Sequence, residues 1–228
     1  MTLKLDKLIA VSALLLIATI GQSQTCDYTI SPSTHHNWVD ISAQYITDSI
    51  GLGFDTMIVR HSKKINVSSK DYNGKQSLVT RSYLKWDQAF DDQNSCTISS
   101  AFLTLKFTGN NADSHRTTSG SNKFIISRLT EEWGDDTLRW KTPGVKDNYR
   151  MPISSSTDAI TVNGTTVGDE DYKINITSFL NYWRNNPNDN FGIEIRLADE
   201  SGTRSLNFAS SEFVSLLGHP KIEIVFSN

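Results

Sequence analysis

Cysteine and net charge are both scarce in this chain of 228 residues. It has two cysteines, Cys26 and Cys96, and no CxxC pair, which argues against a metal site built from thiolates. The formal net charge is −3 at pH 7. A nucleic-acid-binding surface needs concentrated positive charge, and none of the usual recognition motifs occurs, so we expect no nucleic-acid partner.

Long apolar runs are also missing, apart from one near the N-terminus. There LIAVSALLLIATI (8–20) follows Lys4 and Lys7 and leads into the small and polar GQSQ (21–24). This order is that of a signal peptide, and the run is shorter than the roughly 18 residues of a spanning helix. A retained membrane anchor is the alternative. We predict a signal peptide at 1–23 and a secreted or cell-surface-associated mature chain with no stable membrane insertion.

Export gives the two cysteines a role. Disulfides persist in oxidising compartments, and an exported chain enters one. Cys26 lies at the start of the mature chain, and Cys96 lies in DQNSCTISS (92–100). We therefore expect a Cys26–Cys96 disulfide that pins the N-terminal arm to the body of the domain.

Apolar and polar residues alternate with period two in many segments, which is typical of half-buried strands. Alternation predicts that Leu84 and Trp86 face the core and that Tyr83, Lys85 and Glu194 face away from it. The predicted strands include SYLKWD (82–87), SAFLTLKF (100–107), FGIEIRLA (191–198), KIEIVFS (221–227), DTMIVRH (55–61), KFIISRL (123–129) and RSLNFAS (204–210).

One helix is predicted, at TSFLNYWRNN (177–186). Thr177 can cap its first turn, Phe179 and Trp183 share one face, and Pro187 follows its end. Many short strands with one short helix predict an all-β fold, an antiparallel β-sandwich of jelly-roll type.

Five segments in chain order resemble the DNRLRE-type domain of carbohydrate-binding modules and disaggregatase-related proteins of bacteria and archaea. They are RSYLKWDQ, ISSAFLTLKF, LTEEWGDDTLRWKTPG, YKINITSFLNYWRNNPNDNFGIEIRL and LNFASSEF…GHPKIEIVFS. The resemblance runs from about Asp55 to Phe226. It implies a DNRLRE-like sandwich at 55–228, with 24–54 as an arm and first strands, that binds polysaccharide, in some members a uronic acid polymer gripped by basic side chains.

Four carboxylates crowd the segment TEEWGDDTLRWKTPG (130–144): Glu131, Glu132, Asp135 and Asp136. A glycosidase needs two carboxyl groups about 5 to 9 Å apart, but four acids around a glycine are more typical of a solvated turn. In that interpretation Trp133 and Trp140 are structural, as are Trp86 and Trp183. The alternative is a structural calcium loop that uses Asp135 and Asp136. We expect no other cofactor.

Basic and aromatic side chains alternate on the polar faces of several predicted strands. If the strands are neighbours, one sheet presents these groups together and can grip an anionic sugar chain. The alternative is an ordinary solvated strand face. The candidate ligand-binding residues are Arg60, Lys63, Lys64, Arg81, Tyr83, Lys85, Phe102 and Lys106.

Catalytic constellations are hard to find. His35 and His36 are adjacent and would point to opposite sides of an extended segment, and no GxSxG elbow occurs. We therefore expect a non-enzyme that binds an extracellular polysaccharide. The alternative is a structural or adhesive surface protein with protein partners. A small polysaccharide lyase or hydrolase would need a cleft with a perturbed carboxylate, Tyr or His.

Overall fold

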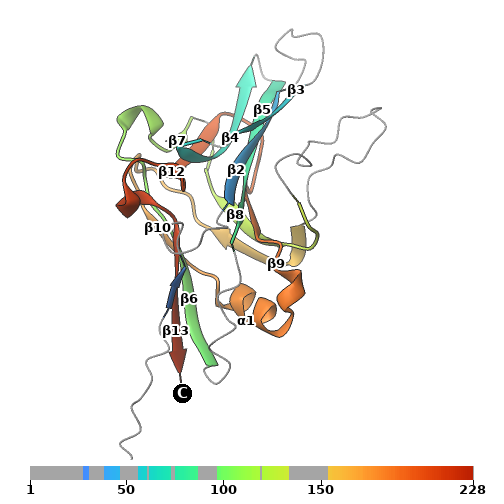
Figure 1. Ribbon diagram of the computed structural model, residues 1–228. Helices are drawn as coiled ribbons and strands as arrows, with labels where there is room; N and C mark the ends of the chain where they lie inside the picture. Colours follow the sequence, from blue (N-terminus) through green and yellow to red (C-terminus); the bar gives the residue numbers. More distant parts are fainter. Residues whose placement is uncertain are drawn as a thin grey trace, which may run out of the picture.

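Two antiparallel sheets make up most of the protein, as the computed structural model shows in Figure 1. The structure describes residues 28–30, 39–46, 56–60, 62–72, 75–86, 97–118, 120–133 and 154–227. The smaller sheet has four strands in the order β1 (Tyr28–Ile30), β13 (Lys221–Ser227), β6 (Thr97–Leu105) and β10 (Tyr172–Asn175). The predicted signal peptide, Cys26, Cys96, Asp135, Asp136 and Trp140 lie outside the described residues, so those predictions stay open.

The larger sheet has nine strands. Its main path contains β7 (Arg116–Thr117), β12 (Arg204–Ala209), β4 (Lys64–Tyr72), β5 (Lys75–Lys85), β11 (Ile193–Leu197), β8 (Phe124–Leu129) and β9 (Ser154–Val162). Off this path, β2 (Val39–Ile46) pairs with β5, and β3 (Thr56–Arg60) pairs with β2. Long β5 thus organises the sheet, because it pairs with β2, β4 and β11.

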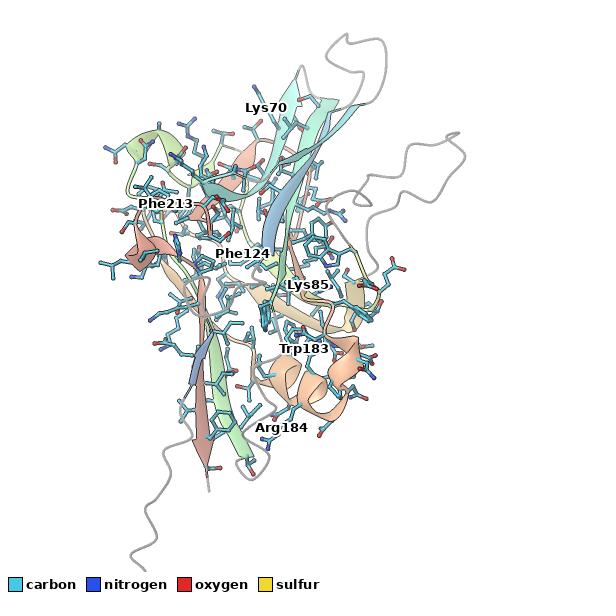
Figure 2. All side chains as sticks on the ribbon, viewed as in Figure 1. Lys70, Lys85, Phe124, Trp183, Arg184 and Phe213 are labelled. Atoms are coloured by element: carbon cyan, nitrogen blue, oxygen red, sulfur yellow. The ribbon has the colours of Figure 1, made fainter. Side chains whose placement is uncertain are left out.

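The core lies between the two sheets and is closed at one end by α1 (Thr177–Asn185). Alternation along β6 sends Ala101, Leu103 and Leu105 into it, and all three are fully buried. Trp183 of α1 meets Trp86 edge to face, with ring centroids 5.4 Å apart, and Figure 2 labels Trp183 and Phe124 in this interior. The described residues therefore form an all-β antiparallel sandwich of jelly-roll type with one short helix, which confirms the predicted fold class.

The start of α1 differs from the prediction. Thr177 is the first helical residue and not its cap, and the preceding Ile176 has no capping side chain. Instead, the carboxamide oxygen of Asn175 accepts hydrogen bonds from the Thr177 N–H (3.0 Å) and hydroxyl (2.6 Å). The Thr177 hydroxyl oxygen accepts from the Ala101 N–H at 2.8 Å, which ties the helix to β6. The helix ends at Asn185, immediately before Asn186 and Pro187, as predicted.

Short helical turns complete the described elements. They are η2 (Asn111–Asp113), η3 (Pro187–Asp189) and η4 (Leu216–Gly218). In the described ranges, no helix combines the length and the apolar character that crossing a bilayer would demand.

Candidate functional site

The predicted ligand-binding residues fall on two different sheets. Arg81, Tyr83 and Lys85 lie on β5 of the larger sheet, whereas Phe102 lies on β6 of the smaller one and Lys106 directly follows it. The prediction of one continuous basic and aromatic face was therefore wrong. Strand adjacency depends on which distant segments pair, and period-two alternation carries no information about that pairing.

On β5, the predicted ligand-binding residue Tyr83 does not face solvent. Tyr83 is fully buried, and its hydroxyl donates to the Glu194 carboxylate at 3.0 Å. Glu194 on neighbouring β11 is only 2% exposed, so the prediction that both residues face solvent was wrong. The reason is a second layer outside the sheet, where the Trp133 ring packs 5.8 Å from the Tyr83 ring.

Arg81 belongs to a partly buried charge cluster, which we define as Arg81, Glu194, Arg196 and Glu200. Its guanidinium binds both oxygens of Glu200, at 2.7 and 2.8 Å, and reaches Glu194 Oε1 at 3.2 Å. Arg196 Nε lies 3.5 Å from the other Glu194 oxygen. Two cations and two anions thus balance within the cluster.

The ionisation of this cluster follows from its contacts. Burial disfavours the charged guanidinium, but the bond to Glu200 and the charges of Glu200 and Glu194 outweigh it and raise the pKa of Arg81. Burial, together with the charge of Glu194, raises the pKa of Tyr83 well above its ordinary value. Tyr83 is therefore a neutral donor to Glu194, and Arg81 is committed to protein carboxylates.

The other predicted basic residues are scattered. Lys85 lies 3.9 Å from Glu132, and Figure 2 shows it away from β13. Lys64 Nζ binds Asp113 at 2.6 Å, and Lys63 is exposed. Arg60 ends β3, where only the backbone is described. These residues do not join the Arg81 cluster in any described contact.

The β6 side has an organised polar surface on the outer face of the smaller sheet. Pairing places Thr104 of β6 between Lys173 of β10 and Lys221 of β13. Two residues earlier on β6, on the same face of the sheet, Phe102 lies between Asn175 of β10 and Glu223 of β13. We call these six residues the Phe102 face: Phe102, Thr104, Lys173, Asn175, Lys221 and Glu223.

Glu223 connects the two lysines of the Phe102 face. Its Oε1 lies 3.0 Å from Lys221 Nζ, and its Oε2 lies 3.1 Å from Lys173 Nζ. Hydrogen bonds from Lys221 and Lys173 lower the pKa of Glu223, so the carboxylate is ionised at neutral pH. Lys173 Nζ also lies 5.0 Å from the centroid of the Phe102 ring, within the range of a cation–π contact.

Exposure differs between the centre and the rim of this face. The side chains of Lys173 and Lys221 are 58% and 38% exposed, so solutes in solution can reach them. Thr104 between them is 8% exposed, and its hydroxyl oxygen has no hydrogen-bond partner among the described residues. Lys106 lies beyond this row and is paired with Asp171 at 3.2 Å.

Sequence reasoning found Phe102 and Lys106 but missed Lys173, Lys221 and Glu223. The alternation of KIEIVFS already implies that Lys221 and Glu223 face away from buried Ile222 and Ile224. The contact between Glu223 and Lys173 forms only because β6 lies between β10 and β13 in the sheet. These three strands are far apart in the chain.

A separate surface feature is an exposed apolar turn between β12 and β13, which we define as Val214, Leu216 and Leu217. Their relative exposures are 80%, 68% and 87%. A hydrogen bond across the two ends of the turn stabilises it: the His219 ring nitrogen Nε2 lies 2.8 Å from the Phe213 carbonyl oxygen. Figure 2 labels Phe213 at the start of this turn.

Comparison with protein-family models and with curated proteins finds no match for this sequence. Within the described ranges, no three His, Cys, Asp or Glu side chains gather closely enough to hold a metal ion. The chemistry of the Phe102 face and of the apolar turn therefore carries the functional argument.

Proposed function

We propose that this domain binds an extracellular polysaccharide without catalysis, through the Phe102 face. The observation that carries the proposal is the register of three strands, which brings one aromatic ring together with amide and charged side chains on the outer face of the smaller sheet. Sugar rings present C–H groups that pack on an aromatic face, and hydroxyls that bond to polar and charged side chains. The predicted export signal and the resemblance to the DNRLRE-type domain support the same function.

Tyr83 supports the non-catalytic part of the proposal, because burial raises its pKa well above the ordinary value. Lyase or hydrolase chemistry needs a group with a shifted pKa within reach of the substrate. Tyr83 and Glu194 are 0% and 2% exposed and bond to each other, so a polymer cannot reach them without opening the structure.

Affinity electrophoresis of the mature protein in gels with hydroxyethylcellulose, galactomannan or polygalacturonate tests the proposal. We expect retardation by at least one polymer, and a loss of about fivefold in affinity on Phe102→Ala. Phe191→Ala is the matched control, because Phe191 is a half-buried phenylalanine beside β11 of the larger sheet. Unretarded migration in every gel would refute the proposal.

The apolar turn favours a second candidate, a structural or adhesive surface protein. Three neighbouring aliphatic side chains with such exposure form a patch suited to a protein contact. If this is the main function, Leu216→Ser with Leu217→Ser abolishes adhesion to protein-coated surfaces and leaves polysaccharide retardation unchanged. Equal adhesion by the wild type and the double variant would remove this candidate.

A further inference from the structure

The Phe102 face contains a pair of lysines that a single carboxylate occupies. Lys173 and Lys221 approach from the two strands that flank β6, and both ammonium groups lie within 3.1 Å of Glu223. Such a pair, without Glu223, is suited to bind a carboxylate or sulfate of an acidic sugar. Glu223 already supplies that carboxylate from within the protein.

We propose that Glu223 determines the specificity of the Phe102 face, because it occupies Lys173 and Lys221 and thereby selects uncharged sugars over acidic ones. This inference rests on the proposed polysaccharide-binding function and names the class of sugar. It differs from the expectation of a uronic acid polymer gripped by basic side chains, of which Arg81 and Lys85 lie on the other sheet.

Competition inside the protein is the first reason. Glu223 is held on the same sheet face as both lysines, so its effective concentration beside them exceeds that of any free acidic sugar. An acidic sugar would have to displace it or lie beside it, and like charges placed side by side oppose binding. Specificity against one ligand class is commonly obtained through such repulsion.

Charge balance is the second reason. Lys173 and Lys221 contribute two positive charges and Glu223 one negative charge, which leaves a net charge of +1 on the face. Lys106, the next lysine along the chain from β6, is neutralised by Asp171 at 3.2 Å. The attraction for a polyanion is therefore weak and is screened further by salt.

The groups that remain for an uncharged sugar are the third reason. The partly buried Phe102 ring offers an aromatic surface, and the exposed Asn175 side chain lies beside it in the strand register. Each ammonium group has three N–H donors, so bonding to Glu223 leaves donors for sugar hydroxyls. These contacts need no charge on the ligand.

The test compares Glu223→Gln with the wild type on hydroxyethylcellulose, galactomannan and polygalacturonate. Glutamine keeps the shape of the side chain, and we expect affinity for polygalacturonate to rise about threefold to tenfold at low salt. The gain should vanish at about 0.5 M salt, where the screening length is only a few ångströms. The readout is the ratio of the affinity for polygalacturonate to the affinity for the uncharged polymers, which should rise in Glu223→Gln relative to the wild type.

Asp171→Asn is the matched control, because it makes the same change in net charge at the Lys106 pair outside the Phe102 face. The proposal predicts a clearly smaller gain for this control, and predicts that Lys221→Ala in the Glu223→Gln background removes the gain. Equal gains for Glu223→Gln and Asp171→Asn would overturn it, as would wild-type protein that prefers polygalacturonate.

Different results would refute the polysaccharide-binding function and the role of Glu223 in specificity. If the wild type binds none of the polymers, the proposed function is wrong. The role of Glu223 in blocking the lysine pair is still decided by the comparison of Glu223→Gln with Asp171→Asn on polygalacturonate. Thermal unfolding of each variant confirms that the sheet is intact, since Glu223 is partly exposed and its replacement removes no core packing.

Discussion

Replacing Arg81 with alanine separates a structural role for this residue from the ligand-binding role that its sequence context suggests. In the structure, Arg81 holds Glu200 through two hydrogen bonds and Glu194 through a third. Glu194 is 2% exposed, so its charge would lose a hydrogen-bonded cation and keep Arg196 at 3.5 Å as its nearest cation. Removing one partner of a buried pair strands the other charge in a medium that solvates it poorly.

The expected loss follows from this geometry. A fully buried pair costs about 3 to 5 kcal/mol when one partner is removed. The side chains of Arg81 and Glu200 are 23% and 19% exposed, so water partly solvates the remaining charges. We therefore expect a loss of about 2 to 3 kcal/mol in the free energy of unfolding, which is roughly 5 to 10 °C in Tm for a domain of this size.

Urea unfolding followed by tryptophan fluorescence measures this loss. Lys85→Ala is the control, because Lys85 lies on the same strand and its 3.9 Å pair with Glu132 is largely exposed, which makes a change under about 0.5 kcal/mol the expectation. The structural role of Arg81 would be refuted if Arg81→Ala lowered the free energy of unfolding by less than about 1 kcal/mol and also weakened retardation by polysaccharide.

Two further predictions concern stability. Gly192 has φ of 85°, and a Cβ there would clash with the Leu84 carbonyl oxygen, so Gly192→Ala should lower the free energy of unfolding in urea by at least about 2 kcal/mol. A loss under about 0.5 kcal/mol would contradict this. His115 is buried and neutral, accepting at Nδ1 from the Asn207 N–H and donating from Nε2 to the Glu170 carbonyl. Burial lowers the pKa of His115 below 6.5, so the unfolded chain binds its proton first, and stability falls as pH drops from above 6.5. Unfolding curves between pH 7.5 and 5 should show a shallower decline for His115→Gln, and an equal decline would exclude His115 as a cause.

Much of the fold was predictable because it follows from local patterns. Alternation along 101–105 and 222–224 places apolar side chains on one face of each strand, and those side chains form the core. The end of α1 was predictable for the same reason, since Pro187 cannot continue a helix. Its start was not, because the capping oxygen comes from Asn175 at the end of the preceding strand.

The candidate site was predictable only in part, because it depends on contacts between distant segments. The alternation rule assumes that one face of each strand meets water, but the Trp133 ring packs against Tyr83, and both Tyr83 and Glu194 are buried. No local pattern reports such a second layer. Similarly, Lys173 and Lys221 become neighbours of Glu223 only when β10 and β13 pair with β6.

The most direct test of the central claim is quantitative binding of the mature protein to uncharged polysaccharide, measured for the wild type, Phe102→Ala and Phe191→Ala under identical conditions. The account predicts binding that resists salt, an affinity about fivefold weaker for Phe102→Ala, and an unchanged affinity for Phe191→Ala. Equal affinities for the wild type and both variants, or an absence of binding throughout, would contradict the assignment of the Phe102 face as a polysaccharide-binding surface.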